Sequence, residues 1–396
     1  MDFMENMNEI LRMQPETIRN IFLPIVAFMM GGCIGSFLNV VIYRLPNDLK
    51  VNKPKRSFCP NCKTQIPMWL NIPLVTWLML RGRCKWCDVK ISSRYFMVEL
   101  MTAVCFLAVY RLFFQNPSFT PGSPMGMEVV VCYWIFISLL IAATFIDFDH
   151  MIIPDSITIG GCAAGIVASV IVPELHEQST HLKGLGMSLV GAAAGYGLLW
   201  LVVNAGKLMF GRLKFDFDEP TEFTVSQPNP DENPQIKIGD FEQDYGFVFG
   251  RKSDRLKMNI HELRLNGETI ENVETFVLHM DSVEVNGEKR DLEGVKSLEG
   301  TCLNAVVPRE AMGMGDVKFL AMIGAFLGWK AVIITVFLAA VIGAVVGIAQ
   351  RLATSEKWSR EFPFGPYLAL GAFVALFAGS ALISWYLGLM QDGFFN

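Results

Sequence analysis

Two segments that lie far apart in the sequence place aspartates at the ends of apolar helices. Gly313-Met-Gly-Asp316 precedes the apolar run 319–329, and an earlier apolar run ends at Asp147. A carboxylate at a membrane boundary is a candidate for function. Two carboxylates that meet there can divide the work of peptide hydrolysis, because one takes a proton from water and the other donates one to the carbonyl. The pattern therefore predicts an aspartyl protease with Asp147 and Asp316 as its catalytic pair.

The roles of the two aspartates follow from their positions on the helices. We expect them to share one proton and to titrate as a pair. Asp316 begins a helix, where the macrodipole favours an anion, whereas Asp147 ends one, where it disfavours an anion. Asp316 is therefore predicted to be the base and Asp147 the acid. Asp149 and Asp155 are the alternatives to Asp147 as the first catalytic aspartate, although Asp155 is equally suited to be the N-cap of the next helix. The glycines beside Asp316 are expected to let a substrate backbone approach and to permit unusual backbone angles.

Four cysteines form a second candidate site, in two C-x2-C pairs about 21 residues apart: Cys59, Cys62, Cys84 and Cys87. This spacing suits a tetrahedral site in which each pair supplies two thiolates to Zn²⁺, with iron as the main competing metal. Two disulfides are the alternative, but a C-x2-C pair closes a disulfide poorly and a basic cytoplasmic loop is reducing. Four thiolates leave no open coordination position, so the predicted zinc site is structural.

The composition places these residues in a membrane protein. The chain has 396 residues, of which 52% are hydrophobic and 18% charged, and its mean hydropathy is +0.38. These values exclude an ordinary soluble protein of this size, and no nucleic-acid partner is expected. About eight apolar runs are long enough to span a bilayer. They lie at 21–45, 95–114, 129–146, 156–172, 184–208, 313–329, 331–350 and 367–389.

The charge pattern predicts the orientation of these spans. The loop 46–94 carries ten Lys and Arg against two Asp, and short basic loops stay in the cytoplasm. Alternation from this loop puts the N-terminus outside and both aspartates on the cytoplasmic face. The first apolar run is too long for a cleaved signal peptide and lacks a basic segment before it, so it is expected to be retained.

A hydrophilic segment separates the two halves of the predicted site. Between Gly211 and Met312 there are 21 Asp and Glu against 12 Lys and Arg. Apolar and polar residues alternate in its second half and are interrupted by Asn-Gly at 266–267 and 286–287, which is typical of short hairpins. We expect a small β-rich cytoplasmic insert over 211–308, in which the proline-containing stretch 219–244 is a linker.

Taken together, these motifs resemble those of the type IV prepilin leader peptidases, which are GxGD aspartyl proteases. The resemblance rests on Gly-Met-Gly-Asp-Val-Lys at 313–318, Asp-Phe-Asp-His-x3-Pro-Asp at 147–155, the run 35–46, the C-x2-C pairs, and Ile-Ser-Ser-Arg-Tyr at 91–95 with Glu99. It covers nearly the whole chain except the insert. The usual member of the family passes from its fifth span to the GxGD helix through a short loop, so the insert is a departure.

The resemblance implies a function and its cofactors. Members with zinc knuckles remove the leader peptide of type IV prepilins or pseudopilins at the cytoplasmic face of the bacterial inner membrane, and also N-methylate the new N-terminus with S-adenosylmethionine. The basic loop contains no G-x-G-x-x-G run, so the resemblance alone suggests Arg94 and Glu99 as residues of the methyl-donor site. The alternative is that they form a helix-end ion pair. For the insert, contact with a component of the pilus or secretion machinery is expected.

Two other functions remain open from the sequence. One is a peptidase that has lost methyl transfer, because no motif carries that second activity. The other is a membrane transporter or scaffold without enzymatic activity, which would place its acidic residues near the middle of spans and not at helix ends.

The predicted fold class is an all-α polytopic membrane protein with a four-cysteine loop and a β-rich insert, both cytoplasmic. Its expected domains are listed here in chain order: 1–45, the N-terminal segment and first span; 46–94, the zinc-knuckle and methyltransferase loop; 95–210, the helices with the first catalytic aspartate; 211–308, the insert; and 309–396, the GxGD helices.

Overall fold

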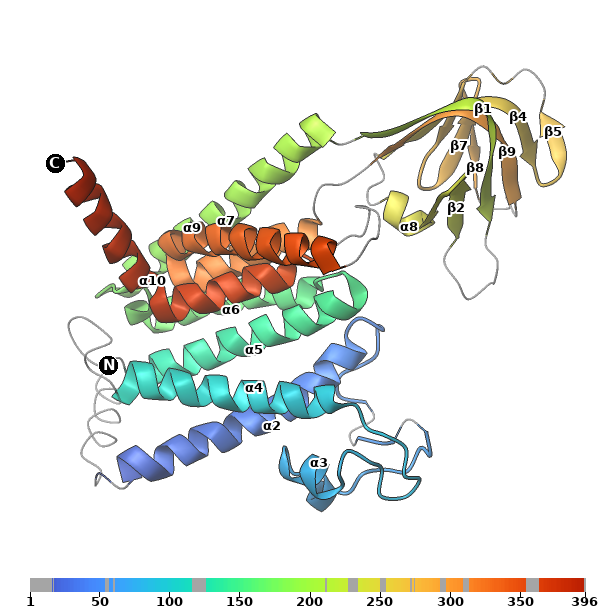
Figure 1. Ribbon diagram of the computed structural model, residues 1–396. Coiled ribbons are helices and arrows are strands. Elements are labelled where there is room, and N and C mark those ends of the chain that lie inside the picture. The colour runs from blue at the N-terminus through green and yellow to red at the C-terminus, as the bar shows by residue number, and fades with distance from the viewer. Residues whose placement is uncertain are drawn as a thin grey trace. The chain divides into compact units, whose positions relative to one another are not determined.

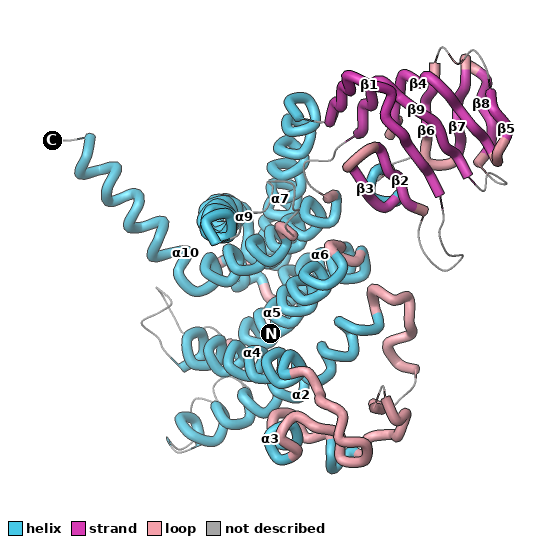
Figure 2. The backbone as a smooth tube through the Cα atoms, turned by 45° about the vertical axis from the view of Figure 1, so that its right-hand side comes forward, coloured by secondary structure: helices cyan, strands magenta, loops and turns pink. Residues whose placement is uncertain are grey.

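The computed structural model divides the chain into two compact units, which are described separately. One is helical and comprises Met1–Leu199 and Met314–Asn396, and the other is Trp200–Gly313. Figure 2 shows the strands gathered in the second unit and the helices mainly in the first. The structure describes residues 16, 18–53, 57–59, 61–115, 126–210, 212–226, 234–249, 254–270, 273, 275–292, 297–308, 313–353 and 363–394. Most of the chain before the first predicted span, the start of the predicted GxGD segment at 309–312, and the connection 354–362 between the last two predicted spans lie outside these residues.

The helical unit is built from long apolar helices (Figure 1). In chain order its helical elements are η1 (Ile18–Phe22), α2 (Leu23–Arg44), η2 (Met68–Leu70), α3 (Val75–Met79), α4 (Ser93–Val109), η3 (Tyr110–Gln115), α5 (Met127–His150), α6 (Asp155–Ile171), η4 (Pro173–His176), α7 (His181–Phe210, whose end lies in the other unit), α9 (Met314–Ala353) and α10 (Gly365–Phe394). Among the described residues, six helices are long and apolar enough to cross a membrane: Asn20–Arg44, Ser93–Gln115, Met127–His150, His181–Leu208, Met314–Gln350 and Gly365–Leu389. The predicted count of about eight spans would require the shorter α6 and both halves of α9 to cross as well.

Helix α9 reverses direction near its middle. Gly328 has φ 79° and ψ 171°, which is not helical. A Cβ added at Gly324 would lie 3.0 Å from Cγ2 of Val332, although these residues would be about 12 Å apart along a straight helix. A straight helix of this length would also measure about 60 Å, twice the thickness of a bilayer core. The α9 segment is therefore a hairpin of two helices, and only glycine adopts the backbone angles at Gly328 without strain.

The first half of α9 lies at the centre of the helical unit. Its residues Phe319, Leu320, Met322, Ile323 and Phe326 are fully buried. Glycines on α6 and α7 permit the close approach: Cβ atoms added at 161, 165, 191 and 195 would collide with atoms of α9. Because small residues allow helices to pack closely in lipid, this half of α9 holds the start of the helix, and with it Asp316, in a fixed position.

The small residues of α2 have a comparable packing role. A Cβ added at Gly31 would lie 2.7 Å from Cα of Ala103, and one added at Gly35 would lie 2.7 Å from Cα of Glu99. Both neighbours belong to α4. The glycine-rich second half of the first apolar run therefore packs α2 against α4.

The second unit is an antiparallel β-structure. Its strands are β1 (Arg212–Ser226), β2 (Gln235–Ile238), β3 (Phe241–Asp244), β4 (Leu256–Leu265), β5 (Glu268–Ile270), β6 (Phe276–Leu278), β7 (Ser282–Val285), β8 (Glu288–Asp291) and β9 (Ser297–Pro308), with the short helix α8 (Tyr245–Val248) after β3. The strand order is β3-β2-β1-β9-β4-β6-β7-β8, and β5 pairs with β4. A buried cluster that includes Phe223, Phe249, Phe276 and Leu263 forms its core.

The hairpins predicted from Asn-Gly are confirmed. Asn266 and Gly267 have φ of 52° and 88°, and Asn286 and Gly287 have φ of 51° and 85°. Positive φ at both central residues defines a type I′ turn, which matches the twist of the flanking strands. These turns connect β4 to β5 and β7 to β8.

The prediction that 219–244 is a linker is wrong. The end of β1 and all of β2 and β3 lie in this stretch, and Phe223, Ile236 and Ile238 are buried in the core. The prolines suggested an extended connection, but Pro220 falls where the pairing of β1 with β9 shifts register between Asp216 and Thr221. A proline is tolerated at such an irregularity because it need not donate to the ladder there.

Candidate active site and cysteine cluster

The ends of several helices bring Asp147 and Asp316 together. Asp147 lies in the last turn of α5 and Asp316 in the first turn of α9. Their exposed fractions are only 4% and 9%, and the two carboxylates are close enough to interact electrostatically. Ile153, which precedes α6, lies between the same helix ends, because Cβ atoms added at Gly315 and at Gly365 would lie 3.4 Å and 2.9 Å from its side chain.

The two carboxylates differ in their hydrogen bonds. The backbone N–H of Gly365, the first residue of α10, donates to Oδ2 of Asp147 at 3.0 Å. By contrast, Oδ1 of Asp316 is buried and has no hydrogen-bond partner among the described residues. A buried carboxylate oxygen without a partner is costly as an anion, while a donated N–H stabilises one. The geometry is thus asymmetric, with Asp147 the better-supported anion.

The rival aspartates are engaged with basic residues. Asp149 forms an ion pair with Arg94, and the N–H of Arg94 Nη1 donates to its Oδ1 at 2.7 Å. Asp155 pairs with Lys318, whose Nζ lies 2.6 Å from Oδ1. The side chains of Asp149 and Asp155 are 35% and 61% exposed. Asp155 also begins α6 itself and makes no N-cap hydrogen bond, since Pro154 is the N-cap residue. Two of the four acids therefore serve as partners of cations, and the two buried ones interact with each other electrostatically.

Gly315 does not have the unusual backbone predicted for it. It lies inside α9, and its φ is outside the left-handed region. A Cβ there would meet three atoms of Ile153 at 3.4 to 3.5 Å, which is ordinary contact. Space beside Ile153, and not backbone freedom, is what this glycine provides in the structure.

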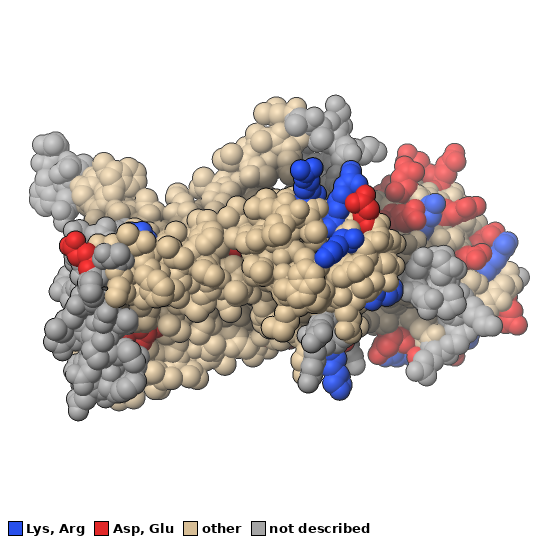
Figure 3. Space-filling model, turned by 90° about the horizontal axis from the view of Figure 1, so that it is seen from below, with Lys and Arg blue, Asp and Glu red and all other residues tan. Residues whose placement is uncertain are grey.

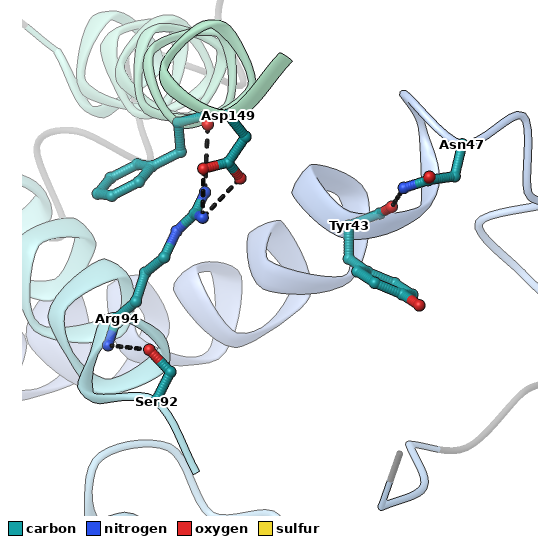
Figure 4. A network of polar contacts seen from close by, with 6 residues as sticks. Tyr43, Asn47, Ser92, Arg94 and Asp149 are labelled. Atoms are coloured by element: carbon teal, nitrogen blue, oxygen red, sulfur yellow. Dashed lines mark hydrogen bonds and ion pairs between the residues drawn. The ribbon is translucent and has the colours of Figure 1, made fainter. Parts of the chain in front are cut away.

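Arg94 and Glu99 contact different groups and do not pair with each other. Figure 4 shows Arg94 reaching from the start of α4 to the end of α5. Besides Asp149, its guanidinium donates to the carbonyl of Phe145 at 3.1 Å and lies 5.1 Å from the centre of that residue's ring. Oε2 of Glu99 accepts a 2.7 Å hydrogen bond from the N–H of Leu74. Each side chain thus fixes one neighbouring segment to α4.

The four cysteines predicted to bind zinc lie in one cluster. Their Sγ atoms are all within 4.8 Å of one another, and those of Cys59 and Cys87 are 3.7 Å apart. All four are free of disulfides. Tetrahedral zinc with Zn–S bonds of about 2.3 Å separates neighbouring sulfurs by about 3.8 Å. The donor set and its spacing therefore fit a zinc ion held by four thiolates.

The backbone around the two cysteine pairs is nearly repeated. The N–H of Cys59 donates to the carbonyl of Thr64, and the N–H of Cys84 donates to the carbonyl of Val89. In both cases the acceptor lies five positions after the donor. Lys63 and Asp88, at equivalent positions, have φ of 56° in each pair. This turn directs backbone N–H groups at the sulfurs. As a result, the hydroxyl and N–H of Thr64 lower the pKa of Cys62 to about 6.

The N–H of Val89 and the side chain of Asn61 likewise lower the pKa of Cys87. Thiolates are the form of cysteine that binds metal. The lowered pKa values therefore favour the metal-binding form of Cys62 and Cys87.

Three contributors to the aspartate site were missed in the sequence. Ile153 and Lys318 are ordinary residue types within the recognised motifs, and neither shows its partner in the sequence. Gly365 belongs to Phe-Pro-Phe-Gly-Pro at 362–366, directly before the last predicted span at 367–389. A glycine between two prolines at a helix start was the one signal that could have drawn attention to this backbone N–H.

Comparison with known proteins gives a consistent result. The bacterial peptidase A24 N-terminal domain matches residues 29–113, and the type IV leader peptidase family matches residues 134–214 and 295–348. The second match is interrupted across most of the insert and includes both aspartates. No solved structure matches the chain.

Curated relatives cover most of the chain. The prepilin leader peptidase/N-methyltransferase of Aeromonas hydrophila is 28% identical over 385 residues, which covers 91% of this chain and 93% of the relative. That of Legionella pneumophila is 26% identical over 389 residues, covering 93% and 95%. The type 4 prepilin-like proteins leader peptide-processing enzyme of Escherichia coli is 36% identical over 196 residues, covering 45% of this chain and 68% of the relative. With these matches and with two buried aspartates meeting at helix ends, the chain belongs to the type IV leader peptidase family.

Proposed function

We propose that the protein is a membrane aspartyl endopeptidase that removes the leader peptide of type IV prepilins or pseudopilins and N-methylates the new N-terminus. The names of its relatives support both activities. The observation that carries the peptidase assignment is the pairing of Asp147 with Asp316. Both are buried and interact electrostatically, while the neighbouring Asp149 and Asp155 are paired with cations.

In the proposed peptidase reaction the two aspartates have opposite roles. Asp147 accepts the N–H of Gly365 and is the ionised group, which takes a proton from the attacking water. Asp316 is protonated and donates to the carbonyl oxygen of the scissile peptide. This assignment is the reverse of the one expected from the position of each aspartate on its own helix. That expectation took into account only the macrodipole of the helix to which each aspartate belongs. Asp147 also accepts an N–H at the start of a second helix, α10, where the macrodipole favours an anion.

The proposed orientation puts both aspartates at the cytoplasmic face of the bacterial inner membrane. The basic loop 46–94 supports it through the positive-inside rule. In this arrangement α6 and both halves of α9 cross the membrane in addition to the five other long helices, which gives eight spans. The insert 211–308 is then cytoplasmic, and it is proposed to contact a component of the pilus or secretion machinery. The other domain boundaries are proposed as given above.

We assign the second activity to the loop 46–94 and the start of α4. Zn²⁺ held by the four cysteines keeps the loop folded and takes no part in the transfer. S-adenosylmethionine supplies a methyl group bound to a sulfonium, which the new amino group accepts. Both Arg94 and Glu99 already have protein partners. Their proposed role at this site is therefore to position the end of α5 and the segment around Leu74.

One assay tests the two activities together. Purified protein in detergent is incubated with a prepilin-like peptide and a labelled methyl donor, and the shift in peptide size and the incorporated label are measured. Asp147→Asn and Asp316→Asn should each abolish cleavage, and the double variant should lose no more, because the residues act as one unit. Asp149→Asn and Asp155→Asn are the matched controls and should retain measurable cleavage.

The outcomes separate the remaining alternatives. Cleavage without incorporated label would indicate a peptidase that has lost methyl transfer. Full cleavage by Asp316→Asn would remove the proposed mechanism. A purified protein that neither cleaves nor methylates any prepilin-like peptide would favour a transporter or scaffold. An already trimmed peptide should still be methylated by the Asp316→Asn protein, since methyl transfer is assigned to a different part of the chain.

A further inference from the structure

The segment 68–86 exposes an unusual number of apolar side chains. None of the residues of η2 or α3 is buried. The exposed large apolar residues include Met68, Trp69, Ile72, Val75, Leu78 and Met79. Contiguous apolar surface of this kind is rare on a protein face in contact with water and marks an interaction site.

This segment contacts two candidate membrane spans, α4 and α2, at residues that lie inside the helices and not at their ends. The N–H of Leu74 donates to Glu99 of α4, and the ring of Trp77 stacks on Phe96 with centroids 5.1 Å apart. Pro73 contacts α2, since a Cβ added at Gly32 would lie 3.5 Å from its Cβ.

The position of Glu99 along α4 gives the depth of this attachment. Helix α4 begins at Ser93, next to the ion pair of Arg94 with Asp149. Glu99 follows about 9 Å farther along the helix axis at 1.5 Å per residue. Helix α3 therefore lies beside α2 and α4, and not beyond their ends (Figure 1).

Basic residues follow the apolar stretch directly. Arg81, Lys85 and Lys90 are exposed. Lys85 also lies over the ring of Trp69, with Nζ 4.6 Å from the ring centre. In Figure 3 the helical unit is tan over most of the face drawn, and its blue Lys and Arg side chains gather towards one end. Apolar and aromatic residues bordered by lysine and arginine are the composition of segments that lie in a membrane interface.

We propose that residues 68–86 form an interfacial foot, which lies in the lipid leaflet on the side of the two aspartates. Its apolar side chains contact acyl chains. Arg81 and Lys85 of the foot, and Lys90 just after it, contact the headgroups of anionic phospholipids. Lipid is the occupant that fits, because the foot continues the lipid-facing surface of α2 and α4 and its basic border complements an anionic headgroup. Cys84 lies within the foot, so the foot also holds the cysteine cluster at the membrane surface.

The test places an environment-sensitive fluorescent amino acid at Met79 in the full-length protein. A matched control carries it at Asn52, which is exposed in the same loop next to the exposed Lys53. Each protein is reconstituted in nanodiscs of phosphatidylcholine and phosphatidylglycerol, with and without bromine on the acyl chains. Brominated lipid should remove most of the emission at Met79 and leave that at Asn52 nearly unchanged. Unchanged zinc content shows that the labelled loop remains folded.

A second arm tests the headgroup contact. Quenching at Met79 should increase with the phosphatidylglycerol fraction and decrease with salt, because surface attraction of this kind is screened. The triple variant Arg81→Gln/Lys85→Gln/Lys90→Gln should lose this dependence.

Three results would overturn the proposal. They are emission at Met79 that brominated lipid leaves unchanged, emission that responds only when a prepilin-like peptide is added, and emission that depends on the number of protein copies per disc. The second would assign the surface to the apolar helix of the substrate, and the third to another copy of the chain. Neither arm depends on catalytic activity, so the foot and the proposed function can fail separately.

Discussion

The backbone N–H of Gly365 donates to Oδ2 of Asp147 at 3.0 Å, across 218 positions in the sequence. The same glycine has no room for a side chain, because an added Cβ would lie 2.5 Å from that oxygen. The start of α10 therefore both supports the charge on Asp147 and limits where its carboxylate can lie.

Replacing Gly365 by alanine should impair cleavage strongly. The new methyl group would displace the Asp147 carboxylate and lengthen its hydrogen bond. Loss of one preorganised donor to a reacting charge lowers kcat by roughly 100-fold or more, and we expect a decrease of that order in peptide cleavage. Gly186→Ala is the control, since a Cβ there meets no atom within 4 Å. Equal activity of the two variants would contradict the proposed contact.

The roles of the two aspartates can be distinguished by infrared spectroscopy. If Asp316 is the protonated partner, the wild-type protein has a carboxylic acid C=O band that disappears in Asp316→Asn. The band should remain in Asp147→Asn, where Asp316 is still protonated. Its loss in Asp147→Asn but not in Asp316→Asn would restore the opposite assignment. The pH dependence of kcat/KM should in either case be bell-shaped, with two apparent pKa values that belong to the pair.

The sequence identified the parts of the site that residue type and spacing reveal. Asp147 and Asp316 were brought to one face by alternation of the spans, without any knowledge of contacts. The C-x2-C spacing predicted the cysteine cluster, and the Asn-Gly pairs predicted two hairpins. The cysteine and Asn-Gly signals are local in the sequence. The aspartate signal needs only the number of membrane crossings between the two residues.

What the sequence missed depends on contacts between distant groups. The Gly365 N–H is a backbone donor and leaves no trace in residue type. The ion pairs that remove Asp149 and Asp155 from consideration require the meeting of α4 with α5 and of α6 with α9. The stretch 219–244 was predicted to be a linker because of its prolines. Its three apolar residues that the sheet buries were too few to indicate strands. In each case tertiary packing decided between local alternatives.

Loss of one cysteine should release the metal. Substituting Cys62 or Cys87 by serine removes one of the four thiolates proposed to hold zinc, so each variant should contain far less than one zinc per chain by elemental analysis. Methyl transfer should decrease before proteolysis does, because the aspartates lie on other helices. Cys33→Ser is the matched control, since that residue is exposed and lies outside the cluster. Full zinc content in Cys62→Ser would count against the four-thiolate site.

The Arg94–Asp149 ion pair should matter more to methyl transfer than to cleavage. Arg94→Gln removes the contacts to Asp149 and to the carbonyl of Phe145, which position the end of α5 beside α4. We expect KM for the methyl donor to rise several-fold while cleavage changes less. Arg94→Lys keeps the charge but cannot make both contacts at once, so it should recover only part of the loss. Unchanged methyl transfer in Arg94→Gln would remove this residue from the proposed site.

The insert should be removable without loss of cleavage. Its first and last strands pair so that Arg212 lies opposite Pro308, and paired residues on adjacent antiparallel strands have Cα atoms about 5 Å apart. A brief Gly/Ser linker can therefore replace 212–308 without straining the ends that remain. The match to the type IV leader peptidase family also stops at residue 214 and resumes at residue 295, so it omits most of this segment.

A short prepilin-like peptide should be cleaved by the shortened protein at close to the wild-type rate, because the insert forms its own buried core and supplies neither aspartate. The shortened protein is expected to differ from the wild type in cleavage of full-length prepilin and in binding of any partner from the pilus machinery. The matched control is the double hairpin-turn variant Asn266→Ala/Asn286→Ala, which strains two turns of the insert and leaves its connections intact. A shortened protein that retains its zinc and its helical circular dichroism, yet cleaves no peptide, would show that the insert belongs to the active site.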